Sequence, residues 1–351
     1  MKVVARISNA FKSFERVMKP YDWWVAWIAG VLTVASIVIT AVGYYREADT
    51  RQRAAIFNAW QIVAGMEEKR AEGGRAEALK ELISHRESLA GVDLRGAILE
   101  KVDFSRTDMR MAKLSEVEFT ACPMLQVNFT GTTLENGWFV AGCNLTGAGF
   151  NQTSIRGTLF SQAVMFRVQF RDTTGDVNTK FDNVDLREAA VANSHLPGAM
   201  FSNVLCQKAK FNDTDLSSAR FKAVIANGWR WRTVTAPGAA FEDFVGQGAH
   251  FEWETDLREA HFDQADLRQA HFDGVDLHEA VFFGADLTAA TFARSNLSGA
   301  DFTSATLLNT RFVGCNIDGA TFTTNPEKHY DPRNFEKCTG KPNIVNVAAR
   351  P

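Results

Sequence analysis

The sequence predicts an all-β solenoid that follows a single membrane-spanning helix. Two observations support this prediction: apolar residues return at every fifth position along most of the chain, and one apolar segment near the N-terminus carries no charge. The 351 residues are 46% apolar, with a formal net charge of −3. This composition is too apolar for a disordered chain, and its near-neutral charge disfavours a broadly basic nucleic-acid-binding protein.

The five-residue periodicity is most regular towards the C-terminus. Fourteen successive apolar residues stand five apart, and they are Leu257, Phe262, Leu267, Phe272, Leu277, Phe282, Leu287, Phe292, Leu297, Phe302, Leu307, Phe312, Ile317 and Phe322. A small residue, most often Ala, stands two places before each of these centres. Five steps along an α-helix leave the next centre about 140° away, and five steps along a strand send alternate centres to opposite faces. The pattern therefore fits a chain that turns once per five residues and directs every centre inward, with coils stacked about 4.8 Å apart.

The same spacing extends upstream. It covers residues 94–139, 145–170 and 181–251, and one extra residue separates each run from the next. We expect each insertion to bulge a corner while the stack continues. The weakest matches are residues 171–180, which could form a longer loop, and residues 220–248, where Trp residues interrupt the pattern.

These residues resemble a known family. The phrases ADLRQ from Ala265 and AHFDG from Ala270 are similar to the A(D/N)LXX repeat of the pentapeptide-repeat proteins. The resemblance covers roughly residues 91–324 and implies a right-handed quadrilateral β-helix, in which four repeats make one square coil. It gives about eleven coils, with Phe stacked on Phe and Leu on Leu. The core residues it implies most directly are Leu257, Phe262, Leu267, Phe272, Leu277, Phe282, Leu287 and Phe292.

Residues 21–45 are predicted to form a transmembrane helix. The segment from 23 to 45 has 23 residues and no charge, and as a helix it spans about 34 Å, enough for a bilayer core. Aromatic residues mark both ends, as a membrane-interface belt would, and they are Trp23, Trp24, Trp27, Tyr44 and Tyr45. Two alternatives stay open, a helix buried in a soluble protein and a cleaved signal peptide. A signal peptide has a shorter apolar region, and Ala41-Val42-Gly43 is a poor cleavage site.

The flanking segments complete the predicted domain organisation. Residues 1–20 combine basic residues with apolar residues at helical spacing, which is typical of an amphipathic helix on an anionic membrane surface or of a basic tail. Residues 46–90 are expected to form a helical connector and an N-terminal cap, interrupted at Gly73-Gly74. The cap is needed because an open solenoid end exposes core side chains. Residues 325–351, which include four Pro residues, are expected to form a C-terminal cap or tail.

The basic residues also bear on topology. Five Lys or Arg residues precede the span, and three follow it within about twenty residues. This asymmetry favours a cytoplasmic N-terminus. The predicted location is a bacterial-type inner membrane, crossed once.

Cysteine and histidine residues are the candidates for chemically reactive or metal-binding sites. Four of the five Cys residues occupy repeat positions and are expected to pack in the core, and they are Cys122, Cys143, Cys206 and Cys315. His250 and His271 both precede a centre and could stack on one face, with His261 across the rod. A metal or proton site there is one interpretation, and a solvated ladder is the simpler one.

Polar residues before the Leu centres form a second candidate column. They are Asp256, Asp276, Asn296 and Asn316. The family resemblance implies that such side chains bond to backbone at the corners, which is a structural role.

Surface charge supplies the candidate binding site. Residues 242–286 hold twelve acidic and two basic side chains, whereas a short stretch upstream is basic and aromatic. We expect that stretch to be a contact surface for a protein partner, formed by Arg220, Lys222, Trp229, Arg230, Trp231 and Arg232. A capped loop is the alternative.

The sequence predicts a protein without enzymatic activity. It shows no phosphate-binding glycine loop, nucleophile elbow or zinc-protease motif, and no metal-ligand spacing. No cofactor or small-molecule substrate is expected, and nucleic acid is not an expected partner. The main hypothesis is a membrane-anchored rigid scaffold that binds a macromolecule. The resemblance also implies an alternative, a DNA-mimicking modulator of a type II topoisomerase, and a structural spacer without a specific ligand is a third possibility.

Overall fold

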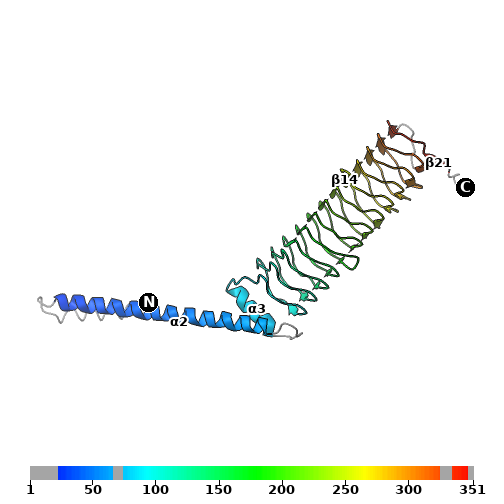
Figure 1. Ribbon diagram of the computed structural model, residues 1–351. Helices are drawn as coiled ribbons and strands as arrows, with labels where there is room; N and C mark the ends of the chain where they lie inside the picture. Colours follow the sequence, from blue (N-terminus) through cyan, green and yellow to red (C-terminus); the bar gives the residue numbers. More distant parts are fainter. Residues whose placement is uncertain (1–22, 66–73, 325–333, 347–351) are drawn as a thin grey trace. The chain divides into compact units, whose positions relative to one another are not determined.

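The computed structural model describes residues 23–65, 74–324 and 334–346 (Figure 1). The chain divides into two compact units, residues 1–58 and residues 59–351. The expected amphipathic segment 1–20 lies outside the described residues, as does the side chain of Trp23.

The predicted membrane span belongs to one long helix, α2 (Trp23–Ala64), of 42 residues. Its apolar side chains are exposed, for example Leu32 at 64% and Ile39 at 71% of their surface. The belt residues Trp27 and Tyr44 are also exposed. The helix is long and apolar enough to cross a membrane.

Helix α2 continues past the predicted span without a break. After Tyr45 its surface becomes charged, with ion pairs one turn apart between Glu47 and Arg51 and between Asp49 and Arg53. Such i,i+4 pairs support an exposed helix weakly. The first part of the expected connector is therefore a helical extension of the span.

Helix α3 (Gly74–Ser84) lies at the start of the solenoid (Figure 1). Its buried apolar residues are Ala78, Leu79 and Leu82. The guanidinium of Arg75 donates a hydrogen bond to the backbone carbonyl of Asp93 in the first coil. These contacts support the capping role expected of this segment.

The rest of the described chain winds into a right-handed quadrilateral β-solenoid of about 12 turns, whose coils stack into a rod (Figure 1). We number the four faces in the order in which the chain visits them, so that Leu99 lies on Face 1, Phe104 on Face 2, Met109 on Face 3 and Leu114 on Face 4. Faces 1 and 3 carry short parallel strands, and single-residue parallel bridges join the coils on Faces 2 and 4.

The strands have the following bounds. Face 1 holds an eight-stranded sheet made of β1 (Ile98–Glu100), β2 (Glu118–Thr120), β3 (Trp138–Val140), β5 (Leu159–Ser161), β7 (Lys180–Asp182), β9 (Met200–Ser202), β11 (Arg220–Lys222) and β13 (Ala240–Glu242). Bridges through His261 and Val281 extend this face to a three-stranded sheet made of β17 (Asp301–Phe302), β19 (Thr321–Thr324) and β21 (Asn343–Asn346). Face 3 holds a ten-stranded sheet made of β4 (Gly149–Asn151), β6 (Gln169–Arg171), β8 (Ala190–Ala192), β10 (Lys210–Asn212), β12 (Arg230–Arg232), β14 (His250–Glu252), β15 (His271–Asp273), β16 (Thr291–Ala293), β18 (Arg311–Val313) and β20 (Phe335–Glu336).

The corners explain why the period is five. At a typical corner the N–H of Ala265 donates to the carbonyl of Phe262 at 3.1 Å, which closes a turn. Gln264, the third residue of that turn, has a φ of 57°. The other backbone groups bond between coils, as in the 2.8 Å bond from the N–H of Leu267 to the carbonyl of Asp286. Each repeat thus uses one backbone hydrogen bond to close its turn and the others to pair with the neighbouring coil. The bonds between coils fix the register along the rod.

The predicted core is confirmed. All fourteen centres from Leu257 to Phe322 are buried. On Face 1 the rings of Phe282 and Phe302 stack 4.9 Å apart, and across the rod the rings of Phe272 and Phe282 meet edge to face at 5.9 Å. Both arrangements are favourable geometries for aromatic pairs.

Two expectations about the repeat boundaries were wrong. Residues 171–180 continue the solenoid and form no long loop, because Thr174 bridges both Ser154 and His195 and Gly175 occupies the centre. The one extra residue widens the corner that follows, where the N–H of Thr179 donates to the carbonyl of Asp176 at 2.9 Å. The repeats also do not end at residue 324: β20 pairs with β18, and β21 pairs with β19. The ring of Phe335 continues the aromatic column, 4.6 Å from that of Phe312.

Candidate functional site

The two Trp residues of the predicted contact surface are in the core. Trp229 and Trp231 are both fully buried, so this part of the prediction was wrong. Trp231 occupies a centre on Face 3, in register with Phe211 and Phe251 on the neighbouring coils. Trp229 fills the position two before it, which usually holds a small residue.

Small residues at nearby centres make room for this excess volume. Ala226, Ala236 and Gly246 replace the Leu that other coils place at the corresponding centres. A Cβ added at Gly246 would lie only 2.4 Å from a ring carbon of Phe244, so that ring fills the space of the missing side chain. The irregularity expected over residues 220–248 is therefore an exchange of volume inside a regular coil.

The four basic residues of the predicted surface do not form one patch. Arg220 and Lys222 lie on β11 of Face 1, whereas Arg230 and Arg232 lie on β12 of Face 3, across the rod. All four are exposed. The prediction grouped them because they are close in sequence, but ten residues carry the chain across two corners.

Sequence reasoning missed Trp253, which is 62% exposed. It follows β14 at the corner that carries the extra residue after Phe251, and its φ of 55° turns it out of the core. The guanidinium of Arg232 lies over its ring, 5.1 Å from the centroid. The displaced residue at an insertion was the signal that could have identified it.

The acidic stretch is distributed around the rod. Glu242 lies on Face 1, Asp266 on Face 2, Glu252 on Face 3 and Asp256 on Face 4. The two basic residues within the stretch neutralise part of it, since Arg258 pairs with Asp256 at 2.7 Å and Arg268 with Asp266 at 2.6 Å. The acidic charge thus does not concentrate on one face.

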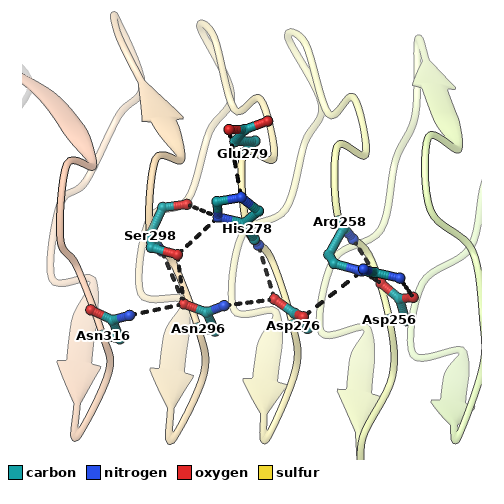
Figure 2. Close-up of polar contacts among 8 residues, drawn as sticks. All are labelled: Asp256, Arg258, Asp276, His278, Glu279, Asn296, Ser298 and Asn316. Carbon is teal, nitrogen blue, oxygen red and sulfur yellow. Dashed lines mark hydrogen bonds and ion pairs between the residues drawn. The ribbon is translucent and has the colours of Figure 1, made fainter.

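A polar column on Face 4 has the predicted structure (Figure 2). Asp256, Asp276, Asn296 and Asn316 bridge successive coils, and each accepts a hydrogen bond from the backbone N–H two residues on. The side chains also bond to each other: the amide of Asn296 donates to Asp276 at 2.9 Å, and that of Asn316 donates to Asn296 at 3.1 Å. This column holds corners in place and has the character of a structural ladder.

Arginine neighbours shift the titration of several carboxylates. A hydrogen bond from Arg268 holds the pKa of Asp266 below its ordinary value, against the opposing effect of partial burial, and Gln247 adds a further bond at 2.7 Å. The pKa of Asp93 is lowered in the same way by Arg95. These carboxylates stay charged at neutral pH and serve as acceptors.

The two His residues expected to stack do so. The rings of His250 and His271 lie 4.8 Å apart, on neighbouring strands of Face 3. Burial, together with the neighbouring His250, lowers the pKa of His271. Among the described residues, no group of three potential metal ligands is found.

The four Cys residues at repeat positions are buried, as expected. Burial raises the pKa of the Cys206 thiol, and it raises that of Cys315 to about 11. Thiols in this state react slowly. They act as small apolar residues of the core.

The geometry defines a class of protein, a quadrilateral β-solenoid built from five-residue repeats. Family models agree: pentapeptide repeats (8 copies) match residues 88–124 and 179–222, and a pentapeptide repeat region matches residues 240–325. The chain is a pentapeptide-repeat protein.

Several solved structures are similar. HetL from the cyanobacterium Nostoc, described as involved in the regulation of heterocyst differentiation, is 22% identical, with 65% of this chain and 87% of that one covered and a TM-score of 0.26. QnrB1, a plasmid-mediated fluoroquinolone resistance protein, is 21% identical over 54% of this chain and 91% of its own, with a TM-score of 0.28. A pentapeptide-repeat protein from the thylakoid lumen of Arabidopsis thaliana is 34% identical over 24% of this chain and 53% of its own, with a TM-score of 0.20. A search of curated proteins found no match.

Proposed function

We propose that this protein is a single-pass membrane protein whose rod is a non-enzymatic platform for binding a protein partner. The observation that carries the proposal is the exposed apolar surface of α2. Val34 and Ile37, in the middle of the span, are 61% and 51% exposed, and the apolar stretch around them is not covered by any other described part of the chain. In water such a surface is costly, whereas in a bilayer it is solvated.

The continuity of α2 argues against a cleaved signal peptide. The helix runs unbroken from Trp23 to Ala64, well past the apolar segment, and its exposed ion pairs suit an aqueous stalk. The intact mass of the purified protein tests this point, because cleavage after the apolar segment would remove more than forty residues.

The platform role follows from how the rod is filled. Its interior is occupied by stacked Phe and Leu side chains, so any partner meets the outer faces. Those faces carry exposed basic residues on β11 and β12, which suit recognition of an acidic protein surface. The spread of acidic residues over four faces does not favour the alternative of a DNA mimic.

Membrane fractionation followed by alkaline carbonate extraction tests the anchor. Wild type is expected to remain in the membrane pellet. The variant Val34→Arg/Ile37→Arg is expected to move to the soluble or aggregated fraction, because each charge costs about 2.5–3.5 kcal/mol at the centre of a span. Phe57→Arg, an equally exposed site on the same helix beyond the span, is the matched control and should stay in the pellet. Release of wild type by carbonate would contradict the anchor.

The partner site is tested by cross-linking in intact cells. Reversal on Face 1 (Arg220→Glu/Lys222→Glu) is compared with reversal on Face 3 (Arg230→Glu/Arg232→Glu). Loss of a cross-linked product with one pair and not the other would locate the binding face. An identical product profile for wild type and both variants would favour a spacer without a specific ligand.

A further inference from the structure

The ten-stranded sheet on Face 3 has two halves of opposite charge. Its strand order places β4, β6, β8, β10 and β12 on one side of its midpoint and β14, β15, β16, β18 and β20 on the other. In each of the nine three-residue strands the central residue is buried and the two flanking residues point outward; in the two-residue strand β20, Phe335 is half-buried and Glu336 is exposed. The outward residues therefore determine the surface charge of each half.

The N-terminal half is basic. Its outward strand residues include four basic side chains and no acidic one, and the basic ones are Arg171, Lys210, Arg230 and Arg232. Within the described part of the chain none of these four forms an ion pair, and Arg232 lies instead over the ring of Trp253.

The C-terminal half is acidic. Its outward strand residues include three carboxylates, Glu252, Asp273 and Glu336, and one basic side chain, Arg311. The carboxylate of Glu252 lies 3.2 Å from the ring of His250, Asp273 pairs with Arg294, and Glu336 lies 3.7 Å from Arg311. These pairs are partly exposed, so they can exchange partners at little cost.

We propose that Face 3 docks onto Face 3 of a second copy of this chain, antiparallel, about a two-fold axis between β12 and β14. This axis is the midpoint of the sheet, so all ten strands overlap. A two-fold axis makes the surface self-complementary, because the basic half of each copy meets the acidic half of the other. This inference goes beyond the proposed function and does not depend on the membrane anchor.

The shared rise of the coils brings the charges into register. Both rods repeat about every 4.8 Å along the axis, so successive strands face successive strands. Strand β12 then faces the partner's β14, which places the guanidinium of Arg232 opposite the partner copy's Glu252 carboxylate. Strand β10 faces β15, where Lys210 can reach the carboxylate of Asp273.

The next pair of strands permits close approach. Strand β8 would face β16, and their outward residues are Ala190 and Ala192 against Thr291 and Ala293. Small side chains on both sides let the two sheets come near each other without a steric conflict. The exposed Trp253 lies beside the axis together with Arg232, and these are the residue types most often found at the centre of an interface.

The size of the contact sets its strength. Nine strand spacings give an overlap of roughly 43 Å, and a three-residue strand is about 10 Å wide, so each copy covers roughly 400 Å². This is about half of the standard protein–protein interface. We therefore expect a reversible dimer that weakens as salt screens the charges.

Sedimentation equilibrium of the full chain in detergent micelles tests the proposal. Wild type should dimerise at low salt. Reversal of the basic half (Lys210→Glu/Arg232→Glu) or of the acidic half (Glu252→Lys/Asp273→Lys) should each raise the dimer Kd at least tenfold, because like charges then face each other at both pairs of positions. An equimolar mixture of the two variants should restore wild-type affinity, since the reversed positions 210 and 232 of one variant then meet the reversed positions 273 and 252 of the other with opposite charges.

The control is a reversal on the opposite face. Arg220→Glu/Lys222→Glu changes as many charges on β11 and should leave the Kd of the dimer unchanged. Only variants whose melting temperature equals that of wild type enter the comparison, so that a change in Kd does not reflect unfolding. Self-association through α2 would persist in every variant and would contradict the proposal. A monomeric wild type at 100 µM and low salt, or no recovery in the mixture, would also overturn it, and the basic half would then be open to a different anionic partner.

Discussion

The coils from Leu257 to Phe322 and the coils around Trp231 both fill the interior of the rod, but with different sets of side chains. In the first region every centre is Leu, Ile or Phe, and identical side chains stack on themselves, as with Phe282 on Phe302 at 4.9 Å. In the second, two indole rings enter one coil, and Ala or Gly takes neighbouring centres on other faces.

The difference shows that the side-chain volume filling each coil stays nearly constant even where the five-residue pattern of centres and small residues is broken. The backbone keeps its register in both regions, since Trp231 pairs with Phe211 and Phe251 as a Phe would. What changes is the cost: the indole N–H groups of Trp229 and Trp231 find no hydrogen-bond acceptor within the described residues. The regular coils carry no such penalty.

The largest effect should come from emptying a regular centre. Phe282→Ala removes a fully buried ring that stacks on two others, and it should lower the free energy of unfolding by about 3–5 kcal/mol. Thermal unfolding followed by circular dichroism measures the change. The adjacent Phe283, 42% exposed, supplies the control, and Phe283→Ala should cost far less. Equal losses would mean that Phe282 is not in the core.

Restoring the repeat in the irregular coils should do harm. Gly246→Leu recreates a regular centre, but its side chain needs space that the Phe244 ring occupies, and the expected loss is about 1–3 kcal/mol. The double variant Phe244→Ala/Gly246→Leu should recover most of it. The double-mutant cycle in the same unfolding assay checks this coupling, and additive effects of the two changes would rule out the exchange of volume.

Trp231→Phe should change stability little. The variant loses some buried area but removes an unsatisfied buried N–H group, whose cost is about 1–3 kcal/mol. We expect a net change within about 1 kcal/mol in either direction. A loss above 3 kcal/mol in chemical unfolding would show that the indole N–H has a partner in the folded protein.

The smallest effect should be the pH-dependent one. Because Arg268 lowers the pKa of Asp266 in the folded state, their pairing stabilises the fold above the ordinary pKa and stops doing so as pH falls through the lowered value. Arg268→Gln should therefore destabilise the protein slightly at neutral pH, because the pair is exposed to solvent, and the difference from wild type should shrink as the pH falls through the lowered pKa of Asp266. Melting temperatures across this range test it. Arg232→Gln, whose partner is the Trp253 ring, should show no such convergence.

The regular coils could be predicted from sequence because the five residues of each repeat determine its local structure by themselves. A small residue, a polar residue and a large apolar centre fix one turn and one inward side chain, so Leu257 and Phe262 could be placed without knowledge of the rest. The ladder from Asp256 to Asn316 follows from the same local rule.

The surface could not be predicted in the same way. Whether Trp229 is inside depends on Gly246, which lies seventeen residues away on another face, and sequence spacing alone does not reveal that exchange. Arg220 and Arg230 are ten residues apart and lie on opposite faces. The last strands, β20 and β21, were missed because residues 325–333 interrupt the five-residue spacing before Phe335 resumes the column.

The most direct test of the whole account is hydrogen–deuterium exchange of the full chain in lipid nanodiscs. We predict very slow exchange for residues 27–45, which the proposed anchor places in lipid, fast exchange for residues 46–58 of α2, which it places in water, and slow exchange across the coils from 94 to 322. If residues 27–45 exchange as fast as residues 46–58, the helix is not in the bilayer, and the membrane-anchored rod proposed for this protein would be contradicted.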